Sequence, residues 1–285
     1  MRDDLLSKIK YLLQHEGFRR SPLRVMVRLV IWWLLCLVKK PVTVKIPGLD
    51  VKAYLPSLWR GQSKQLFVFR QYYEPELAFI ESRLQRDDIF VDVGAAYGIY
   101  SLAAAKIIGK NGKVFSLEPA AGTFAHLKKN IVINGSANVT ALQLAAADKA
   151  GKALLIHHPD HSRNVLSRVD TAEDSEQVRT ISLDELLQEY RLDRVEMVKI
   201  DVEGAEELVL RGAIHLIRSF KPIIIFEVNT AGAGVLGLAH DGAWQLLRSE
   251  GYGFYTCNYD GFTTKLDVMP LSGNVIASHG ELGLY

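Results

Sequence analysis

Residues 89–98 read Ile-Phe-Val-Asp-Val-Gly-Ala-Ala-Tyr-Gly, an apolar run of strand length that ends in a glycine turn. An Ala/Leu/Ile stretch of helix length follows, from Ile99 to Ile108. A buried strand, a tight turn and a helix in this order are typical of the first unit of an α/β sheet. The turn has Ala96 between its two glycines, so it lacks the G-x-G-x-x-G pattern of pyrophosphate loops. The free N–H groups at the N-terminus of this helix predict a binding site for an anion such as a carboxylate.

From residue 89 onward the chain alternates between strand and helix patterns. Strands are expected at 89–93, 113–117, 139–144, 196–200, 223–226, 252–257 and 274–277, and helices at 99–108, 122–133, from Ser182 onward, 205–220 and 243–250. Alternation at this spacing predicts helices on both faces of a mainly parallel sheet. The expected fold class is therefore α/β.

Composition narrows the function classes. With 285 residues the chain can form one large domain, or one domain with an extension. The net charge of +2 is too small to argue for a nucleic acid partner. Cys36 and Cys257 provide no disulfide framework, which fits a reducing, cytoplasmic compartment.

The first 40 residues differ from the rest of the chain. They hold nine Lys/Arg against three Asp/Glu, and they include an unbroken apolar run from Leu29 to Val38. A membrane-spanning helix needs about 20 apolar residues, and this run has about half that length; extending it backward takes in Arg28. We expect a helical extension over 1–60 and a catalytic domain over 61–285. Residues 24–40 would lie in the interface of a membrane, peripherally on its inner face, or pack on the body or on a second copy.

Acidic residues follow three of the expected strands. Glu118 comes after the second strand, at a distance from the glycine turn that suits a carboxylate accepting both hydroxyls of a ribose. Asp201 and Glu203 follow the fourth strand and Glu227 follows the fifth. Because ligands of such sheets bind beyond the carboxyl ends of the strands, these carboxylates would face the reactive end of a ligand. The structural alternatives are a solvated Glu118 at a helix start, and Asp201 and Glu203 as caps of the next helix.

Five ordered motifs closely resemble those of the FkbM-type methyltransferases. They are Phe90–Gly98, Phe115–Pro119, Thr180–Asp184, Met197–Glu206 and Lys221–Glu227. Tyr73–Glu76 is similar to the lead-in of that family, and the likeness runs from about Phe69 to the C-terminus. The resemblance implies a class I methyltransferase fold with a mainly parallel, seven-stranded, Rossmann-like sheet. It also implies S-adenosylmethionine as methyl donor, and a hydroxyl of a sugar or polyketide as acceptor.

The resemblance assigns roles to individual residues. Asp92, Gly94 and Gly98 would line the methionine end of the cofactor, with Ala95 and Tyr97 of the same turn. Glu118 would hold the ribose, Ala147 and Asp148 would lie near the adenine, and Asp201 would sit beside the sulfonium. Many relatives carry Asn where this chain has Ala96, which removes one polar contact but keeps the glycine frame.

The resulting hypothesis is an O-methyltransferase in which Asp201, helped by Glu203 or Glu227, accepts the proton of the acceptor hydroxyl. The acceptor would be a glycan, a lipid-linked saccharide or a polyketide-type natural product. The alternatives are a nicotinamide-dependent oxidoreductase and a membrane-attached binding module without catalysis. The histidines of 157–161 predict a variable loop near the acceptor rather than a metal site, and no metal is expected. The glycines of 232–242 indicate either a lid or a connector.

Overall fold

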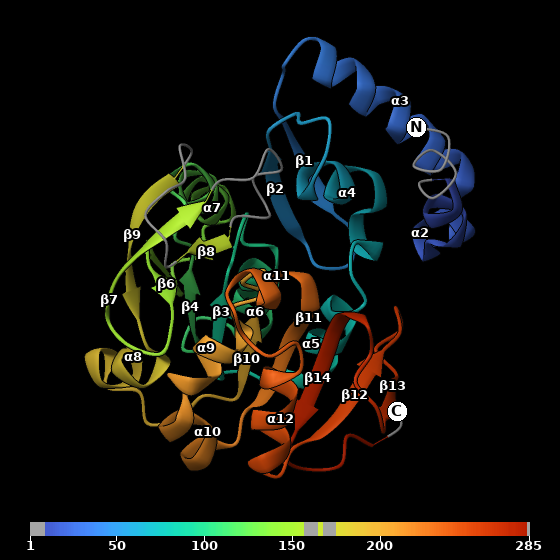
Figure 1. The fold of residues 1–285 in the computed structure, drawn as a ribbon. Helices are drawn as coiled ribbons and strands as arrows, with labels where there is room; N and C mark the ends of the chain where they lie inside the picture. Colours follow the sequence, from blue (N-terminus) through green and yellow to red (C-terminus); the bar gives the residue numbers. More distant parts are fainter. Residues whose placement is uncertain (1–8, 157–164, 168–174, 284–285) are drawn as a thin grey trace.

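The computed structural model describes residues 9–156, 165–167 and 175–283. Its main sheet has eight strands in the order β13-β12-β14-β11-β10-β3-β4-β5 (Figure 1). The bounds are β3 Ile89–Val93, β4 Lys113–Leu117, β5 Val139–Leu142, β10 Met197–Ile200, β11 Ile223–Asn229, β12 Gly253–Cys257, β13 Thr263–Leu266 and β14 Ser272–Ser278. Five neighbouring strands, from β5 to β11, pair in parallel, whereas β14, β12 and β13 add antiparallel pairs. The prediction of a mainly parallel sheet is confirmed, and β13 is an eighth strand that the sequence analysis missed.

Helices cover both faces of this sheet, as predicted (Figure 1). The helices from residue 62 onward are α4 Gln62–Phe69, which packs beside the N-terminal helix α3 (Pro22–Leu37), and α5 Glu76–Arg83, α6 Ile99–Ile108, α7 Ala121–Asn134, α8 Leu183–Tyr190, α9 Glu206–Arg211, α10 Ile214–Phe220, α11 Thr230–Val235 and α12 Gly242–Ser249, with a 3-10 turn at Arg70–Tyr72. Strand β3 shows why two cores form. Phe90 packs into the core that α5 and α6 cover, while Val91 and Val93 pack into the core of α8, α9, α10 and α12. Successive side chains of a strand point to opposite faces, so each face needs its own layer of helices.

The expected single helix over 205–220 is two helices, α9 and α10. The second one begins where the carboxylate of Asp184 accepts hydrogen bonds from the backbone N–H groups of His215 and Leu216, both at 2.9 Å. These bonds satisfy N–H groups that a continuous helix would bond internally. The chain can therefore change direction between α9 and α10.

The N-terminal part is only partly the helical extension that the sequence predicts. Helices α2 (Glu16–Arg20) and α3 (Pro22–Leu37) are followed by an antiparallel hairpin of β1 (Val42–Ile46) and β2 (Val51–Leu55). The apolar residues of the hairpin alternate, with Val44, Ile46 and Ala53 buried, which is the period of a strand rather than a helix. Among the described residues, no helix has both the length and the hydrophobicity that a membrane span requires.

The hairpin is tied to the body by two asparagines of α7. The Asn134 Oδ1 accepts from the Lys52 N–H at 2.8 Å, and the Asn130 Oδ1 accepts from the Tyr54 N–H at 2.7 Å.

A further sheet, in the order β6-β9-β7-β8, was not predicted. It consists of β6 Ala145–Ala146, β7 Gly151–Ile156, β8 Val165–Ser167 and β9 Ser175–Ile181. The histidines of 157–161 lie outside the described residues.

Candidate functional site

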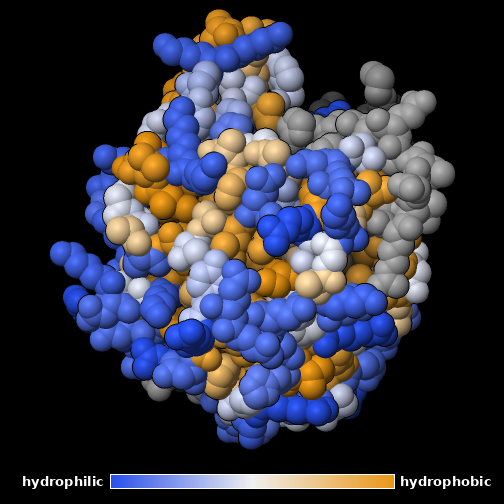
Figure 2. Space-filling model, turned by 90° about the vertical axis from the view of Figure 1, so that its left-hand side faces the viewer, coloured by the Kyte–Doolittle hydropathy of each residue, from blue (hydrophilic) through white to orange (hydrophobic). Residues whose placement is uncertain are grey.

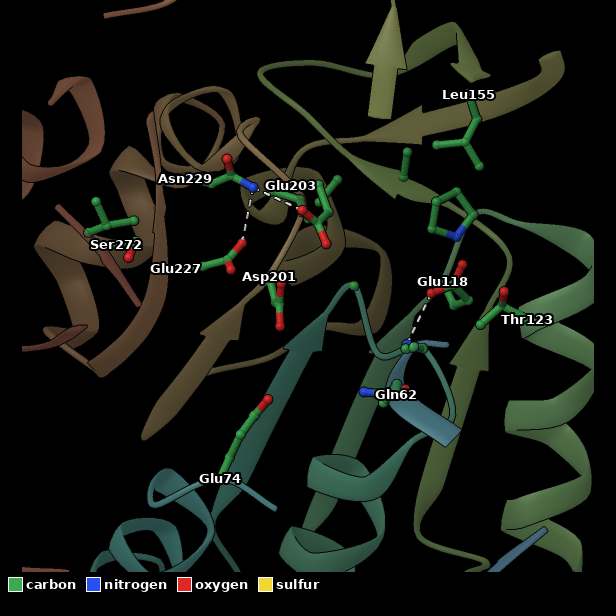
Figure 3. Close-up of a pocket in the computed structure, with 18 of the residues that line it drawn as sticks. Gln62, Glu74, Glu118, Thr123, Leu155, Asp201, Glu203, Glu227, Asn229 and Ser272 are labelled. Atoms are coloured by element: carbon green, nitrogen blue, oxygen red, sulfur yellow. Dashed lines mark hydrogen bonds between the residues drawn. The ribbon is translucent and has the colours of Figure 1, made fainter. Parts of the chain in front are cut away.

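A cavity of about 500 Å³ opens at the carboxyl ends of β3, β4, β10 and β11 (Figure 3). This volume is in the usual range for small-molecule sites. Its acidic lining residues are Glu74, Glu118, Asp201, Glu203 and Glu227, and other lining residues include Gln62, Gln65, Tyr73, Gly94, Ala96, Thr123, Leu144, Ala145, Ala146, Leu155, Asn229 and Ser272. The set of described residues that line it includes no Lys, Arg or His. The cavity is therefore built to receive a ligand with a positive charge or with many hydroxyl groups.

The turn after β3 borders this cavity. Gly94 has a φ of +78°, and a Cβ there would lie 1.8 Å from the backbone oxygen of Asp201. Only glycine permits this close approach of the turn to the end of β10. The N–H groups of Gly94 and Ala95 both donate to the Leu117 oxygen at 2.9 Å, which fastens the turn to β4.

Glu118 lies against the same turn. Its Oε2 accepts the N–H of Ala96 at 3.0 Å, and its Oε1 accepts the N–H of Ala120 at 2.9 Å. Burial raises the pKa of Glu118 to about 7, and the two backbone donors oppose that rise. Each carboxylate oxygen has more than one lone pair, so this fixed carboxylate can accept further hydrogen bonds from a ligand. The glycine turn and the acid of the sequence analysis therefore border one cavity.

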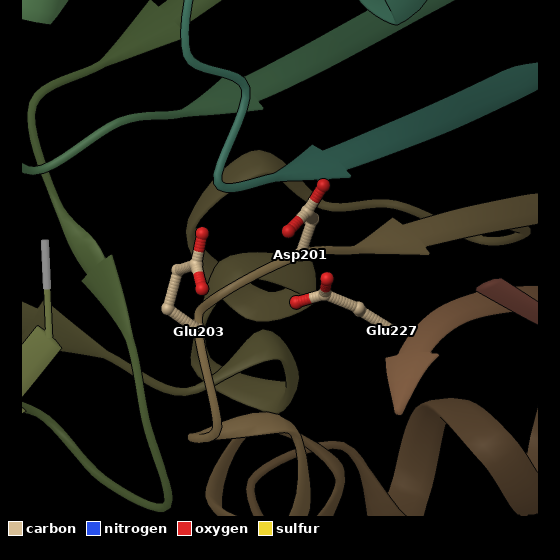
Figure 4. Close-up of side chains that lie close together, drawn as sticks. All are labelled: Asp201, Glu203 and Glu227. Carbon is tan, nitrogen blue, oxygen red and sulfur yellow. The ribbon is translucent and has the colours of Figure 1, made fainter. Parts of the chain in front are cut away.

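The side chains of Asp201, Glu203 and Glu227 converge (Figure 4), and they line the same cavity as Glu118 but lie apart from it (Figure 3). Carboxylate oxygens of the three residues all lie within 4.8 Å of one another. The Nδ2 of Asn229 donates to Glu203 Oε2 at 2.8 Å and to Glu227 Oε2 at 3.4 Å, so it bridges the two glutamates (Figure 3). Three oxygens at this spacing are also a donor set that hard cations accept. The expectation that no metal binds stays a prediction.

The acidic surroundings change the protonation of Glu227. Burial, together with the negative charges of Asp201 and Glu203, raises the pKa of this carboxyl to about 8. Like charges that share a site cannot all ionise at little cost. At neutral pH the cluster therefore holds a proton that a cationic ligand can displace.

Asp201 is held by a buried lysine that the sequence analysis did not single out. The Nζ of Lys199 lies 3.0 Å from Asp201 Oδ2, and the lysine side chain is 1% exposed. Burial alone would lower the pKa of Lys199, but Asp201, Glu74 and Glu76 together raise it. The signal in the sequence was a lysine inside an apolar strand, since Lys is almost never fully buried unless it is paired.

The cap alternative for Asp201 and Glu203 does not describe the structure. Helix α9 begins at Glu206, whose Oε1 accepts the N–H groups of Val202 at 3.3 Å and Gly204 at 3.1 Å. The Glu206 side chain thus holds the loop between β10 and α9 by hydrogen bonds. Asp201 pairs with Lys199, and Glu203 accepts a hydrogen bond from Asn229. The two acids are left to face the cavity.

Four residues that were predicted to bind the cofactor are not among those that line the cavity. They are Asp92, Ala95, Tyr97 and Gly98. Asp92 is buried, and its Oδ2 accepts the backbone N–H of Ser101 at 3.0 Å and the Ser101 hydroxyl. Burial raises the pKa of Asp92 to about 6, although the bonds from Ser101 oppose this rise. Ala95 and Tyr97 are buried, and Gly98 is the residue that precedes α6. These residues position the turn and the helix, so their direct contact with the cofactor stays a prediction.

Ala147 and Asp148, which the sequence analysis places near the adenine, are not among the residues that line the cavity, and their contact with the cofactor stays a prediction. Ala145 and Ala146 line the cavity, whereas Ala147 bonds its N–H to the Ile181 oxygen at 2.9 Å and Asp148 follows it. The pairing of β6 with β9 turns the chain away after Ala146. No pattern in the sequence revealed this short strand, because its partner lies about 35 residues later.

Several lining residues were missed because they are distant in sequence. Gln62 and Gln65 come from α4, and Ser272 begins β14. Tyr73 and Glu74 belong to the segment that resembles the lead-in of the family, which was the one signal available for them. Figure 3 shows Gln62 and Glu74 below the acidic cluster and Glu118.

Comparisons with known proteins place the chain in a family. The model of the methyltransferase FkbM domain matches residues 92–254. Two curated relatives are a hexuronic acid methyltransferase, AglP, of Haloferax volcanii and a methyltransferase, sdnD, of Sordaria araneosa. The first is 30% identical over 141 residues, half of this chain and 56% of that protein. The second is 26% identical over 177 residues, 51% of this chain and 68% of that protein.

Among solved structures, the methyltransferase FkbM of Methylobacillus flagellatus KT aligns with a TM-score of 0.47 and 16% identity, over 76% of this chain and 53% of that one. The family match covers more than half of the chain and both sides of the cavity. The chain therefore belongs to the FkbM family of S-adenosylmethionine-dependent methyltransferases, with the class I fold that its sequence implies.

Proposed function

We propose that this enzyme transfers a methyl group from S-adenosylmethionine to a hydroxyl oxygen of a saccharide. One observation carries the proposal: Glu118 and the acidic cluster of Asp201, Glu203 and Glu227 line one cavity, and Figure 3 shows Glu118 set apart from the cluster. A carboxylate set apart from a second group of carboxylates fits a ligand with ribose hydroxyls at one end and a positive charge at the other.

The donor fits the residues present. Glu118 would accept the ribose hydroxyls, Ala145 and Ala146 offer apolar surface for a base, and the acidic cluster matches a sulfonium. When bound, S-adenosylmethionine supplies a methyl group on a positively charged sulfur. The residues of this chain then have two tasks, which are to align the acceptor oxygen with that methyl group and to remove the proton of the hydroxyl.

Glu227 is the best placed of the three acids to take this proton. Asp201 is engaged by Lys199 and Glu203 is engaged by Asn229 at 2.8 Å, whereas the bond from Asn229 to Glu227 is long, at 3.4 Å. A general base works best when its pKa lies near the working pH, and the pKa of Glu227 is about 8. Asp201 would contribute a fixed negative charge beside the donor.

The charge of the cavity also bears on the acceptor group. A hexuronic acid, the substrate in the name of the archaeal relative, offers both a carboxylate and hydroxyls. The acids that line the cavity would repel a carboxylate and tolerate a neutral hydroxyl. Gln62, Gln65 and Ser272 at the rim supply donors and acceptors for sugar hydroxyls.

The test is transfer of isotopically labelled methyl to a panel of saccharides, uronic acids and hydroxylated polyketides. Transfer to a hydroxyl gives an ether that survives mild alkali, whereas transfer to a carboxylate gives an ester that alkali cleaves. We expect alkali-stable label in a saccharide, lost in Glu227→Gln but retained in Glu81→Gln on the exposed face of α5. Label in polyketides alone, alkali-labile label, or full activity of Glu227→Gln would contradict the proposal.

A further inference from the structure

Helix α3 exposes a long apolar face. We define the outer face of α3 by its exposed apolar side chains: Leu23, Met26, Val27, Val30, Ile31, Trp33, Leu34, Leu37 and the following Val38. Their exposed fractions run from 43% for Ile31 to 77% for Leu23. Scattered exposed apolar residues are common, but a contiguous apolar face marks an interaction site.

The opposite side of α3 fixes this orientation. Val25, Trp32 and Cys36 are buried against the body, and the Trp32 Nε1–H donates to the Leu58 oxygen at 2.8 Å. The rings of Trp32 and Phe67 of α4 have centroids 5.0 Å apart. The outer face cannot turn inward without breaking these contacts, so it needs a partner from outside the described chain.

Arg28 does not interrupt the outer face, although the sequence suggested an interruption there. Its Nη1 donates to the Val68 oxygen at 3.0 Å, on the side of α4, and its side chain is half-buried. Burial lowers the pKa of Arg28. Because the Arg28 guanidinium bonds to α4, the outer face carries no charged side chain from Met26 to Val38.

The charged residues that adjoin the outer face along the chain are positive. No Asp or Glu occurs in the sequence between Gly17 and Leu49. Arg24 near the start of α3 and Lys39 and Lys40 after its end are exposed. Figure 2 keeps the vertical axis of Figure 1, so its top is the end of α3, where hydrophobic side chains are edged by hydrophilic ones. A partner with a negatively charged surface and an apolar interior matches this pattern.

The length of α3 excludes a span and suits a helix lying flat. Its 16 residues extend about 24 Å, less than the hydrocarbon core of about 30 Å, and one of its sides is already occupied by the body. A second copy is a poorer partner, because in a two-fold contact Arg24 and the Lys39–Lys40 pair would meet cations in either helix direction.

We propose that α3 lies in the plane of an anionic lipid bilayer, with the outer face of α3 among the acyl chains. Arg24, Lys39 and Lys40 would contact lipid phosphates, and Trp33 would sit at the level of the headgroups. Gln62 and Gln65 of the neighbouring α4 line the cavity, so the bilayer holds the enzyme by an element adjacent to its active site.

The first experiment measures co-sedimentation of the full chain with vesicles of phosphatidylcholine, with and without 30% phosphatidylglycerol. We expect binding to the anionic vesicles that Val30→Asp with Leu34→Asp weakens about tenfold or more, since two apolar side chains lose their burial. The matched control is Val132→Asp, an exposed valine of α7, which should bind like the unaltered protein. Each variant is checked for unchanged heat of S-adenosylmethionine binding.

The second experiment tests the charges. Lys39→Glu with Lys40→Glu should weaken binding to anionic vesicles about tenfold or more, whereas the control pair Lys110→Glu with Lys113→Glu should not. Quenching of Trp33 by brominated lipid, absent in Trp33→Phe, would report insertion in protein that is folded. Failure to bind anionic vesicles, equal effects of both lysine pairs, or a dimer that Val30→Asp dissociates would overturn the proposal.

Discussion

Donor binding should displace a proton from the acidic cluster, and the product should not. S-adenosylmethionine carries a positive sulfonium, whereas S-adenosylhomocysteine carries a neutral thioether in the same frame. The two ligands share the ribose, the amino acid and the base. Any difference between them in proton release therefore reports the effect of the sulfonium charge on the carboxylates around Asp201 and Glu227.

The magnitude follows from the pKa of Glu227, which is about 8 without ligand. At pH 7 such a carboxyl is about 90% protonated. An opposite charge within about 4–6 Å lowers a carboxyl pKa by roughly 1–3 units, and a shift of two would leave it about 10% protonated. We therefore expect S-adenosylmethionine to release about 0.8 proton more than S-adenosylhomocysteine at pH 7, and about 0.1 at pH 9.

Calorimetry measures this number directly. Binding heats are recorded in two buffers of different ionisation enthalpy, and the slope against that enthalpy gives the protons released. Glu227→Gln should remove the difference between the two ligands while both still bind. The matched control is Glu81→Gln, which replaces an exposed glutamate on α5 and should leave the difference at its original size.

Two results would refute the reasoning. Equal proton release with both ligands in the unaltered enzyme would mean that the sulfonium does not lie beside a protonated cluster. A difference that survives in Glu227→Gln but disappears in Glu203→Gln would show that Glu203, and not Glu227, carries the proton. In the first case the predicted position of Asp201 beside the sulfonium fails as well.

Three further predictions concern the frame of the site. Glu118→Gln should weaken S-adenosylmethionine and S-adenosylhomocysteine alike, about tenfold or more in Kd by calorimetry, because both carry the ribose that this carboxylate would bind. Gly94→Ala should cost more than about 2 kcal/mol of unfolding free energy in urea, since its Cβ would meet the Asp201 oxygen at a positive φ, whereas Gly122→Ala has open space and should be near neutral. Lys199→Met should cost about 3–5 kcal/mol in the same assay, because it leaves buried carboxylates without their cation; an unchanged midpoint would show that the pair is dispensable.

The sequence predicted the strands of the parallel half of the sheet because each is a short apolar run beside a glycine turn. Strand β3 and strand β4 have the predicted bounds, and so does helix α6. Strand β13 was missed because Thr263–Leu266 contains two threonines and a lysine and lies at an edge, where no burial pattern is required. The hairpin of β1 and β2 falls within the range 1–60 that was expected to be helical. The alternation of its apolar residues is the signal that distinguishes it from the continuous apolar run of the helix before it.

The site was predicted where its residues follow strands, since strand ends meet at one edge of the sheet. This rule found Glu118, Asp201, Glu203 and Glu227, all of which line the cavity. It could not find Gln62, which reaches the cavity from the N-terminal side of the chain through the packing of α4. Nor could it tell a ligand contact from a supporting bond, as for Asp92, whose carboxylate is used by Ser101.

The placement of Lys199 distinguishes Asp201 from the other acidic residues that line the cavity. Within the described chain it is the lysine whose side chain is buried, and it pairs with Asp201 rather than with Glu118 or Glu227. Burial raises the pKa of Glu118 to about 7, and burial together with the charges of Asp201 and Glu203 raises that of Glu227 to about 8. Glu227 therefore holds a proton at pH 7 when no ligand is bound. In the proposed reaction a sulfonium beside Glu227 would displace its proton, whereas the neutral thioether of the product would allow the proton to return. On this proposal, loss of the positive charge would weaken binding of the product relative to the donor.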